Sequence, residues 1–391
     1  MFESNSPLIA VRVFPTGIKS KEYTMQRNEI IRSYGTDYKG MTKRLLKAAD
    51  LKSEISSPAL RIGIKPNLVT PTPASYGATT HPEIVAGIIE YLKENDIDDI
   101  SVIEGSWVGD KTSEAFEYCG YNALAKKYGV KLIDTQKEAS YAQNCGGLEL
   151  NICNCVKDID FLINVPVLKG HCQTHITCAL KNLKGLIPNK EKRRFHSMNL
   201  HDPIAHLNIG IKQDFIVIDN ICGDLDFEEG GNPVTCNCIM AAKDPVLTDA
   251  YVCRSLGYEL GDVPYINIAA SLGVGSNDLD SLKLITLEGK SAAQSLASGK
   301  VLEVSYAVDE IDSCSACYAS LIPALTRLKD EGLLERLNEK ICIGQGYRGQ
   351  KGRLGIGHCT AGFNFSIQGC PPGEEDVYNA LKEYILTSSK A

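Results

Sequence analysis

Two spacings of apolar residues along the chain predict an α/β core. The short apolar runs RIGIK (61–65) and ISVIEG (100–105) have the length of buried strands. Between them, HPEIVAGIIEYLKEN (81–95) repeats apolar residues three or four positions apart, which is typical of a helix with one buried face. TSEAFEYCGYNALAKKYG (112–129) predicts a helix broken at its central glycine, and VKLID (130–134) predicts a third strand. This β-α-β-α-β order predicts parallel strands covered by helices.

The same alternation continues through the middle of the chain. DFLINVP (160–166), DFIVIDN (214–220) and CIMAAKDP (238–245) predict further strands. VLTDAYVCRSLG (246–257) predicts a helix that ends at a glycine. We therefore expect an α/β fold with a mostly parallel sheet flanked by helices.

The composition changes near residue 304, and we expect a domain boundary there. Residues 1–304 would form the α/β core, and residues 305–391 a smaller α+β region that holds five cysteines. In that region a helix is expected over 322–340, a short strand over 341–344 and a final helix over 374–386.

Composition and charge narrow the class of protein. The chain has 391 residues, of which 43% are apolar and 23% are charged, as in ordinary globular proteins. Its net charge of −7 argues against nucleic acid as the main partner. No stretch approaches the roughly 20 apolar residues that cross a bilayer, and the first residues lack a secretory signal, so we expect a cytoplasmic protein without a membrane partner.

Disulfides are an unlikely use of the fifteen cysteines in a reducing cytosol. Some are expected to be buried free thiols, an alternative that also stays open for the C-terminal ones, whereas metal or cluster ligation is the natural use of those that are paired and flanked by glycine. Cys314 and Cys317 form a C-x-x-C pair in SCSACY, and Cys359 and Cys370 lie among glycines and prolines in GHCTAGFNFSIQGCPPG. Four thiolates suit either a [4Fe–4S] cluster or zinc. The second pair is more widely spaced than a zinc knuckle, which favours the cluster.

Other uses of these cysteines stay open. Zinc would make the region a structural support, and a C-x-x-C pair alone can be a dithiol redox site. The G-C-P-P ending resembles the last cluster ligand of hydrogenase small subunits and of the related complex I subunit. Cys342, between two isoleucines, is interpreted as a buried strand residue.

A basic, histidine-containing stretch, INVPVLKGHCQTHITCALKNLKGLIPNKEKRRFH (163–196), predicts an anion site. Ligands of open α/β sheets bind beyond the carboxyl ends of strands, where this stretch begins. We expect Lys169, His171 and Lys181 to act on the ligand. The residues expected to bind it are Lys65, Asn67, Asn182 and His196.

His171, His175 and Cys178 are spaced as on one face of a helix, and a helix is expected there. His171 and His175 could then bind a metal, although hydrogen-bonded core histidines are the more common case.

Together these segments resemble a known family. IKPNLV, TTHPEIVAGIIEYL, VIEGS, NVPVLKGHCQTHITCALKNLKGLIP, FIVIDNICG and MAAKDPVLTDAYVCRSLG occur in the order found in the family called domain of unknown function 362, over roughly residues 60–275. The resemblance implies iron–sulfur cysteines beside the core, since family members often carry them. The compact two-cluster ferredoxin module that family members usually add is absent from this sequence.

The sequence therefore predicts a [4Fe–4S] redox protein or oxidoreductase that acts on a small anion. Two alternatives are an electron carrier or cluster-maturation partner that docks on a redox partner protein, and a zinc-stabilised binding module.

Overall fold

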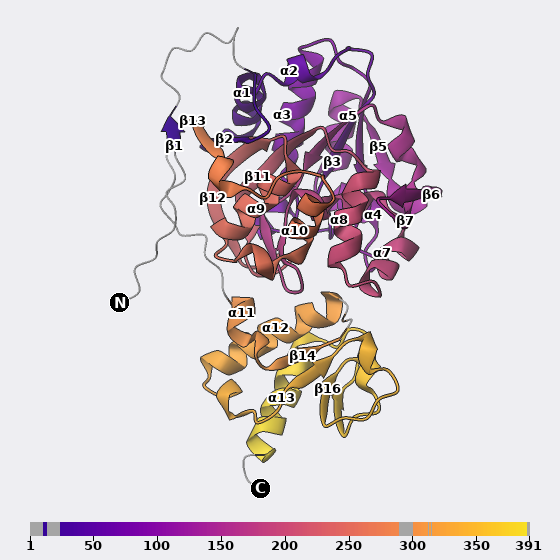
Figure 1. Ribbon diagram of the computed structural model, residues 1–391, viewed down its shortest axis with the longest axis vertical. Coiled ribbons are helices and arrows are strands. Elements are labelled where there is room, and N and C mark those ends of the chain that lie inside the picture. The colour runs from indigo at the N-terminus through magenta and orange to yellow at the C-terminus, as the bar shows by residue number, and fades with distance from the viewer. Residues whose placement is uncertain (1–10, 14–23, 289–299, 312, 314, 389–391) are drawn as a thin grey trace.

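The structure, a computed structural model, contains one large and one small β-sheet with helices around each (Figure 1). It describes residues 11–13, 24–288, 300–311, 313 and 315–388. The large sheet has nine strands and the small sheet has four, and two further strand pairs form hairpins.

The large sheet is mostly parallel, as predicted. Only β12 runs antiparallel to its neighbours, β11 and β2, among the described strands of this sheet. From edge to edge the strands are β1 (Val11–Val13), β13 (Lys283–Glu288), β2 (Glu29–Tyr34), β12 (Pro233–Ala242), β11 (Phe215–Asp224), β8 (Phe161–Val165), β3 (Ile62–Pro66), β4 (Ile100–Glu104) and β5 (Lys131–Asp134).

Helices bury both faces of this sheet, which explains why the strands read as continuous apolar runs. On β11, Val217 packs into the core on one face and Ile218 into the core on the other. The first face is covered by α1 (Tyr38–Ala48), α2 (Leu51–Glu54), α3 (Pro82–Lys93), α4 (Thr112–Tyr118) and α5 (Tyr121–Tyr128). The second is covered by α6 (Ala179–Asn182), α7 (Asn189–His196), α8 (His201–Gly210), α9 (Pro245–Ser255) and α10 (Pro264–Ser271).

Single residues mark the boundaries of helices, as the sequence predicts. Gly120 has a φ of +81° and separates α4 from α5, a conformation that glycine adopts without a steric penalty. Asp244 caps α9, because its carboxylate accepts from the backbone nitrogens of Val246 and Leu247 at 3.0 Å each.

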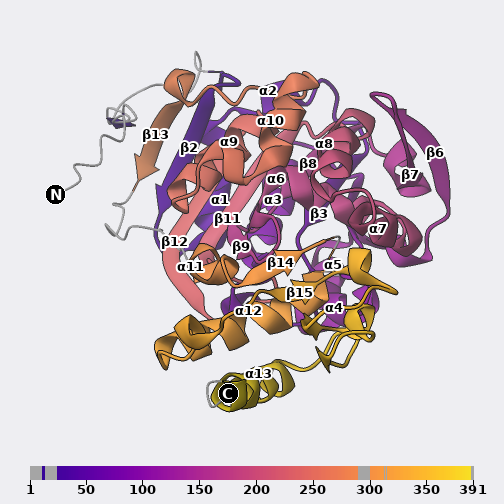
Figure 2. The same ribbon diagram turned by 60° about the horizontal axis from the view of Figure 1, so that its bottom comes forward.

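The small sheet is wholly parallel and contains β14 (Val308–Glu310), β15 (Ile341–Ile343), β16 (Leu354–Ile356) and β17 (Phe365–Ile367). It packs with α11 (Lys300–Ser305), α12 (Ser315–Asp330) and α13 (Glu374–Ser388) below the large sheet in Figure 1, and Figure 2 brings it forward. The helix expected over 322–340 is wrong in its bounds, since α12 begins earlier and ends at Asp330. Residue 304, the expected boundary, falls within α11.

The helix expected through His171, His175 and Cys178 is wrong. The chain forms a hairpin of β9 (Lys169–His171) and β10 (His175–Thr177), in which His171 and His175 are register partners. His175 turns the chain with a φ of +62°. A second hairpin joins β6 (Ser140–Cys145) to β7 (Leu148–Cys153). Within the described part of the chain, no helix combines the length and apolar character needed to cross a bilayer.

Candidate functional site

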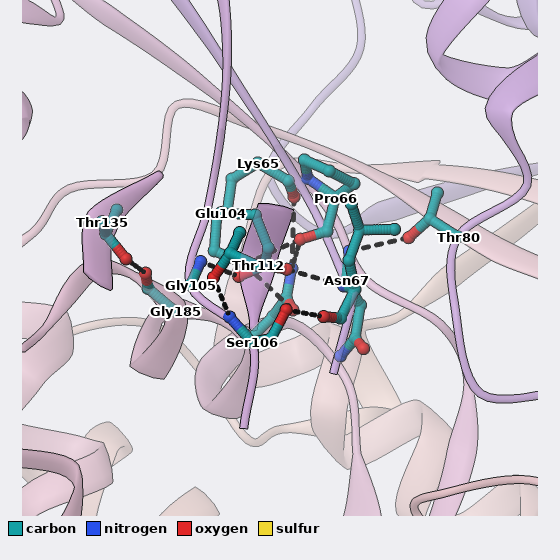
Figure 3. A network of polar contacts seen from close by, with 12 residues as sticks. Lys65, Pro66, Asn67, Thr80, Glu104, Gly105, Ser106, Thr112, Thr135 and Gly185 are labelled. Carbon is teal, nitrogen blue, oxygen red and sulfur yellow. Dashed lines mark hydrogen bonds and ion pairs between the residues drawn. The ribbon is translucent and has the colours of Figure 1, made fainter. Parts of the chain in front are cut away.

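The candidate site lies beyond the carboxyl ends of β3 and β4, and a buried ion pair forms its floor. Lys65 Nζ lies 2.8 Å from Glu104 Oε1, and neither side chain is more than 3% exposed. Glu104 also accepts from the backbone nitrogens of Leu68 and Gly105, both at 2.7 Å. Figure 3 shows these groups converging between Asn67 and Gly105. The carboxylate therefore balances the lysine charge and fixes both strand ends.

Amide side chains connect this pair to α6. Asn182 Nδ2 donates to Asn164 Oδ1 at 2.7 Å and to the Lys65 carbonyl at 3.2 Å. Asn164 Nδ2 donates to the Ala179 carbonyl at 2.9 Å. All of these groups are buried, so the network holds α6 against the ends of β3 and β8.

Glu228, in the loop after β11, joins the hairpin to α6. Its Oε1 lies 2.8 Å from Lys181 Nζ, and its Oε2 lies 2.7 Å from His171 Nε2. Burial raises the pKa of Glu228, but His171 and Lys181 outweigh burial and hold it well below the usual range. His171 Nδ1 accepts from the backbone nitrogens of Gln173 and Thr174 at 3.1 and 3.0 Å, so its proton lies on Nε2. Burial lowers the pKa of His171 to about 4, although Glu228 acts in the opposite direction.

Lys169 stands behind this wall and is fully buried. Its ammonium donates to the carbonyls of Ala78 and Glu228, at 2.6 and 2.8 Å, and to Asn67 Oδ1 at 3.4 Å. Burial lowers its pKa to about 7. Lys169 thus ties the Glu228 loop to the segment that follows β3.

A cavity of about 70 Å³ opens in front of these groups, which is room for a small oxyanion or a few waters. Its charged lining residues are four lysines and two glutamates, and the chain's single tryptophan also lines it. The lining residues that carry the argument are Lys65, Glu104, Trp107, Lys181, Lys184, Lys192, His196 and Glu228.

Lys184 and Lys192 place two ammonium groups at the cavity, and a bound anion would stabilise their charged form. In the described part of the chain Lys184 Nζ has no hydrogen-bond or ion-pair partner, and its aromatic neighbour is the Phe195 ring at 6.0 Å. Burial lowers the pKa of Lys184 to about 7. Lys192 Nζ donates to the carbonyls of Gly105 and Ser106 at 2.9 Å each, and burial lowers its pKa to about 8. A bound anion would raise both pKa values and gain a charge-assisted contact.

His196 adds an uncharged polar side chain to the cavity lining. Its Nδ1 is buried and has no hydrogen-bond partner among the residues that the structure describes. Burial, together with Lys184, lowers the pKa of His196 to about 3, so the ring does not carry charge at neutral pH. An unpaired buried nitrogen is costly, and a ligand or water in the cavity would satisfy it.

The structure brings together most of the residues predicted for this site. Lys65, Asn67, Lys181, Asn182 and His196 line one cavity, whereas Lys169 and His171 lie outside its lining and hold its wall. His171 and His175 also contact different groups, since the His175 ring stacks on Tyr258 at 5.0 Å between centroids.

Five of the lining residues that carry the argument were not among the predicted site residues: Glu104, Trp107, Lys184, Lys192 and Glu228. Lys184 and Lys192 lie in the basic stretch 163–196, whereas Trp107 and Glu228 come from segments with no local motif. The acidic GDLDFEEGGNPV segment (223–234), unusual beside a basic stretch, is a sequence feature that could have pointed to Glu228.

The C-terminal cysteines gather at one edge of the small sheet. Ile356 on β16 and Ile367 on β17 are register partners, and a cysteine follows each of them by three residues. Cys359 and Cys370 therefore leave the same carboxyl edge of two adjacent parallel strands. Cys317 lies in the first turn of α12.

Glycines let these segments approach closely. His358 N donates to the Gly369 carbonyl at 2.8 Å, which joins the loops that carry Cys359 and Cys370. A Cβ on Gly357 would stand 3.2 Å from Cys317 Sγ and 3.7 Å from that carbonyl oxygen. Arg348 Nε donates to Cys359 Sγ at 3.4 Å.

Cys317, Cys359 and Cys370 are the members of the predicted ligand set that the structure describes. Cys314 lies outside the described residues, and among those described no group of three His, Cys, Asp or Glu side chains is arranged to hold a metal ion. Cys342 lies on β15 and is partly buried.

One hairpin turn connects the two regions. Cys172 follows His171 and is buried in the apolar core of the small sheet together with Cys317 and Tyr318. Gln173 Nε2 donates to Glu310 Oε1 and to the Ser313 carbonyl, both at 3.3 Å. Consecutive residues of one turn thus contact the wall of this cavity and the cysteine-bearing region.

The comparisons with known proteins support the predicted resemblance over the core. Residues 62–254 match the family described as "Domain of unknown function (DUF362)". Every residue that lines the cavity falls inside this range, and all of the C-terminal cysteines fall outside it.

Two known proteins are similar to this chain. "Thylakoid-associated protein sll1697" of Synechocystis sp. (strain ATCC 27184 / PCC 6803 / Kazusa) is 25% identical over 236 residues, which is 56% of this chain and 69% of that protein. The lactate racemase apoprotein from Thermoanaerobacterium thermosaccharolyticum aligns with a TM-score of 0.38 and 12% identity. That alignment covers 58% of this chain and 56% of the racemase chain.

Proposed function

We propose that the protein is an iron–sulfur redox enzyme that acts on a small anion bound in the Lys181–Lys184 cavity. The observation that carries this proposal is the β9–β10 turn. His171 contacts Glu228 on the cavity wall, and the next residue, Cys172, packs beside Cys317 in the small-sheet core. A redox centre and a substrate site would therefore be separated by little more than one hairpin.

Each region would supply one half of the chemistry. Cys314, Cys317, Cys359 and Cys370 would hold a [4Fe–4S] cluster, which exchanges one electron at a time. Lys184, Lys181 and Lys192 would bind the anion, with His196 and Asn182 as uncharged hydrogen-bonding partners. Lys169 and His171 would position Glu228, which limits the positive charge of the cavity when no anion is bound.

Cys370 also supports an exchange of electrons with a partner protein. It is exposed, while Cys317 is buried, so a cluster held by both would have one side near the surface. An electron carrier that docks on a redox partner would use the same side. The anion cavity is what favours an enzyme over a simple carrier.

The first experiment is anaerobic purification followed by analysis of iron, sulfide and zinc. About four irons and four sulfides per chain would support the cluster. Cys370→Ala should lose most of the iron, whereas Cys342→Ala, which removes a partly buried thiol from β15, should keep it. One zinc without sulfide, or full iron retention in Cys370→Ala, would contradict the proposed ligands.

The second experiment tests the anion. Trp107 is the only tryptophan and lines the cavity, so its fluorescence should report sulfate binding directly. Lys184→Met should weaken that binding at least tenfold. Lys190→Met makes the same change of charge at an exposed position six residues away and should leave the binding unchanged. Equal affinities in the two variants would contradict the anion site.

A further inference from the structure

A second polar cluster lies on the side of β11 that faces α3, apart from the anion cavity. His81 is the residue at the start of α3, and Asp219 and Cys222 belong to β11. His81 Nδ1 lies 2.8 Å from Asp219 Oδ2, and His81 Nε2 lies 3.7 Å from Cys222 Sγ. The imidazole therefore connects a carboxylate to a thiol. Thr80, at the right of Figure 3, immediately precedes this histidine.

An irregularity in the strand makes this arrangement possible. In a regular strand, Asp219 and Cys222 would point to opposite faces because they are three residues apart. The register between β11 and β12 shifts between Asn220 and Cys222, and both side chains reach the same imidazole. Such bulges often redirect a side chain at functional sites.

Asp219 fixes the orientation of the ring. Its Oδ2 also accepts from the His81 backbone nitrogen at 2.7 Å, and its Oδ1 accepts from Ile221 N at 3.0 Å. The carboxylate is fully buried and has three donors, so Nδ1 carries a proton and Nε2 is directed at the sulfur. Carboxylate, imidazole and nucleophile in this order is the arrangement that activates a nucleophile in acyl-transfer enzymes.

The shared proton has two possible positions. Ala74 O lies 3.5 Å from Cys222 Sγ and can only accept, so a neutral thiol would donate to it. Alternatively the proton lies on His81 Nε2 and the sulfur is a thiolate. Burial lowers the pKa of His81, but Asp219, followed by Cys222, outweighs burial and raises it to about 10, so the imidazole can carry the positive charge that the second arrangement requires.

The titratable groups around His81 and Cys222 do not replace His81 as the cation beside the sulfur. Tyr38 on α1 faces the His81 ring at 5.7 Å between centroids, and its hydroxyl donates to Asn237 Oδ1. Further titratable groups around the cluster are Glu83 on α3, Tyr121 on α5 and Cys236 on β12. Neither Tyr38 nor Cys236 is a cation, so His81 is the group that can stabilise a thiolate here.

We propose that Cys222, His81 and Asp219 form a nucleophilic thiolate site for small electrophiles with an O–O or S–S bond. Cys222 is only 7% exposed, which restricts its substrates to small molecules such as hydrogen peroxide or a short disulfide. His81 lies between its two partners rather than beside them, and no metal-holding group of three such side chains exists among the described residues.

The reaction balances without any further cofactor. With peroxide, the thiolate attacks one oxygen, an S–O bond forms and the O–O bond breaks. The departing hydroxide takes the Nε2 proton of His81 and leaves as water, so sulfur is oxidised to sulfenic acid and peroxide is reduced. With a disulfide, an S–S bond forms as another breaks, and the departing thiolate takes the same proton.

The test measures the rate at which each cysteine of the intact protein is modified between pH 6 and 8. The probe is methyl methanethiosulfonate, and peptide mass spectrometry identifies the modified residues. Cys236 is the matched control, since it lies on the neighbouring strand, is more exposed, and has a pKa that burial raises. At pH 6 Cys222 should react at least tenfold faster than Cys236, and its rate should change less than threefold up to pH 8.

The variant His81→Gln tests whether Cys222 reacts because His81 activates it or only because the reagent can reach it. His81→Gln should slow the reaction of Cys222 at pH 6 at least tenfold and make its rate rise with pH as that of an ordinary thiol does.

A parallel experiment with hydrogen peroxide and a sulfenic-acid trap distinguishes the substrates. Reaction with both reagents assigns small electrophiles of both kinds, and reaction with the thiosulfonate alone assigns S–S substrates. A Cys222 rate in the unmodified protein that climbs about tenfold per pH unit alongside Cys236, or no reaction in either arm, would overturn the proposal.

Discussion

Single residues set the charge balance of the anion cavity. Lys65 has no exposed surface, and Glu104 is the carboxylate that balances it, at 2.8 Å. Breaking a buried ion pair by removing one partner is far more costly than breaking an exposed pair, because the remaining charge is left without water or a counter-ion.

Glu104→Gln should therefore destabilise the protein by about 3–5 kcal/mol near pH 7, measured by denaturant unfolding. Burial already lowers the pKa of Lys65, and without Glu104 its pKa should fall further. The unfolded chain then binds more protons than the folded one, so the deficit should shrink as the pH rises toward 10. Glu114→Gln breaks the exposed Lys111–Glu114 contact and serves as the control, with no measurable change expected. Equal losses in both variants would contradict the role of the buried pair.

Anion affinity should fall as the pH rises. The pKa of Lys184 is about 7 and that of Lys192 about 8, so both ammonium groups lose protons between pH 6 and 9. Sulfate keeps its charge over this range, which makes it a suitable probe. From pH 6 to pH 8 its affinity should drop by about tenfold, because most Lys184 is then neutral and a proton must be taken up on binding. Trp107 fluorescence titrations measure this directly, and a flat profile would mean that Lys184 does not contact the anion.

At the scale of elements, the repeating parts of the fold could be predicted and the turns could not. Periodicity identified β3, α3, β4 and β8, because each buries a regular pattern of side chains. The β9–β10 hairpin was missed because HCQTH has the spacing of a helix, and only tertiary contacts such as His171 to Glu228 select the hairpin. Similarly, the Asp219–His81–Cys222 cluster depends on a strand bulge that leaves no signal in the sequence.

The candidate site follows the same division. Lys65 and Asn67 were predicted because strand ends of parallel sheets converge at one edge, and Lys181 because it lies in the basic stretch 163–196. Lys192 lies in the same stretch but was not singled out, and the position of Trp107 depends on long-range packing. Cys359 and Cys370 were selected as candidate ligands from their spacing, while the parallel small sheet that aligns them was not predicted.

The glycine loops of the small sheet give an element-scale prediction. Gly357 and Gly349 both have positive φ angles, +82° and +76°, so alanine strains either position similarly. Only at Gly357 would the new Cβ meet Cys317 Sγ, whereas Gly349 has no atom within 4 Å of that position. Gly357→Ala should therefore lower the iron content of the reconstituted protein by more than half, and Gly349→Ala should leave it unchanged. Equal iron contents, measured per chain, would show that the Gly357 loop does not adjoin the proposed metal centre.

On the scale of the whole molecule, the turn between β9 and β10 is where the two regions can influence each other. His171 is tied to the cavity through Glu228, Cys172 is part of the small-sheet core, and Gln173 binds Glu310. Packed cores transmit strain over such short paths because they contain few voids. We therefore expect a ligand in the cavity to change the surroundings of Cys359 and Cys370 at the carboxyl edge of the small sheet.

Saturating sulfate should lower the reduction potential of the proposed cluster. An added negative charge favours the oxidised form, and a shift of tens of millivolts is expected, where about 59 mV corresponds to a tenfold change for one electron. The potential would be measured by redox titration with and without sulfate, while Trp107 fluorescence confirms that the anion is bound. Lys184→Met should abolish the shift and Lys190→Met should keep it. An unchanged potential with sulfate bound would mean that the cavity and the cluster act independently, and the protein would then combine a binding module with an electron carrier rather than form one redox enzyme.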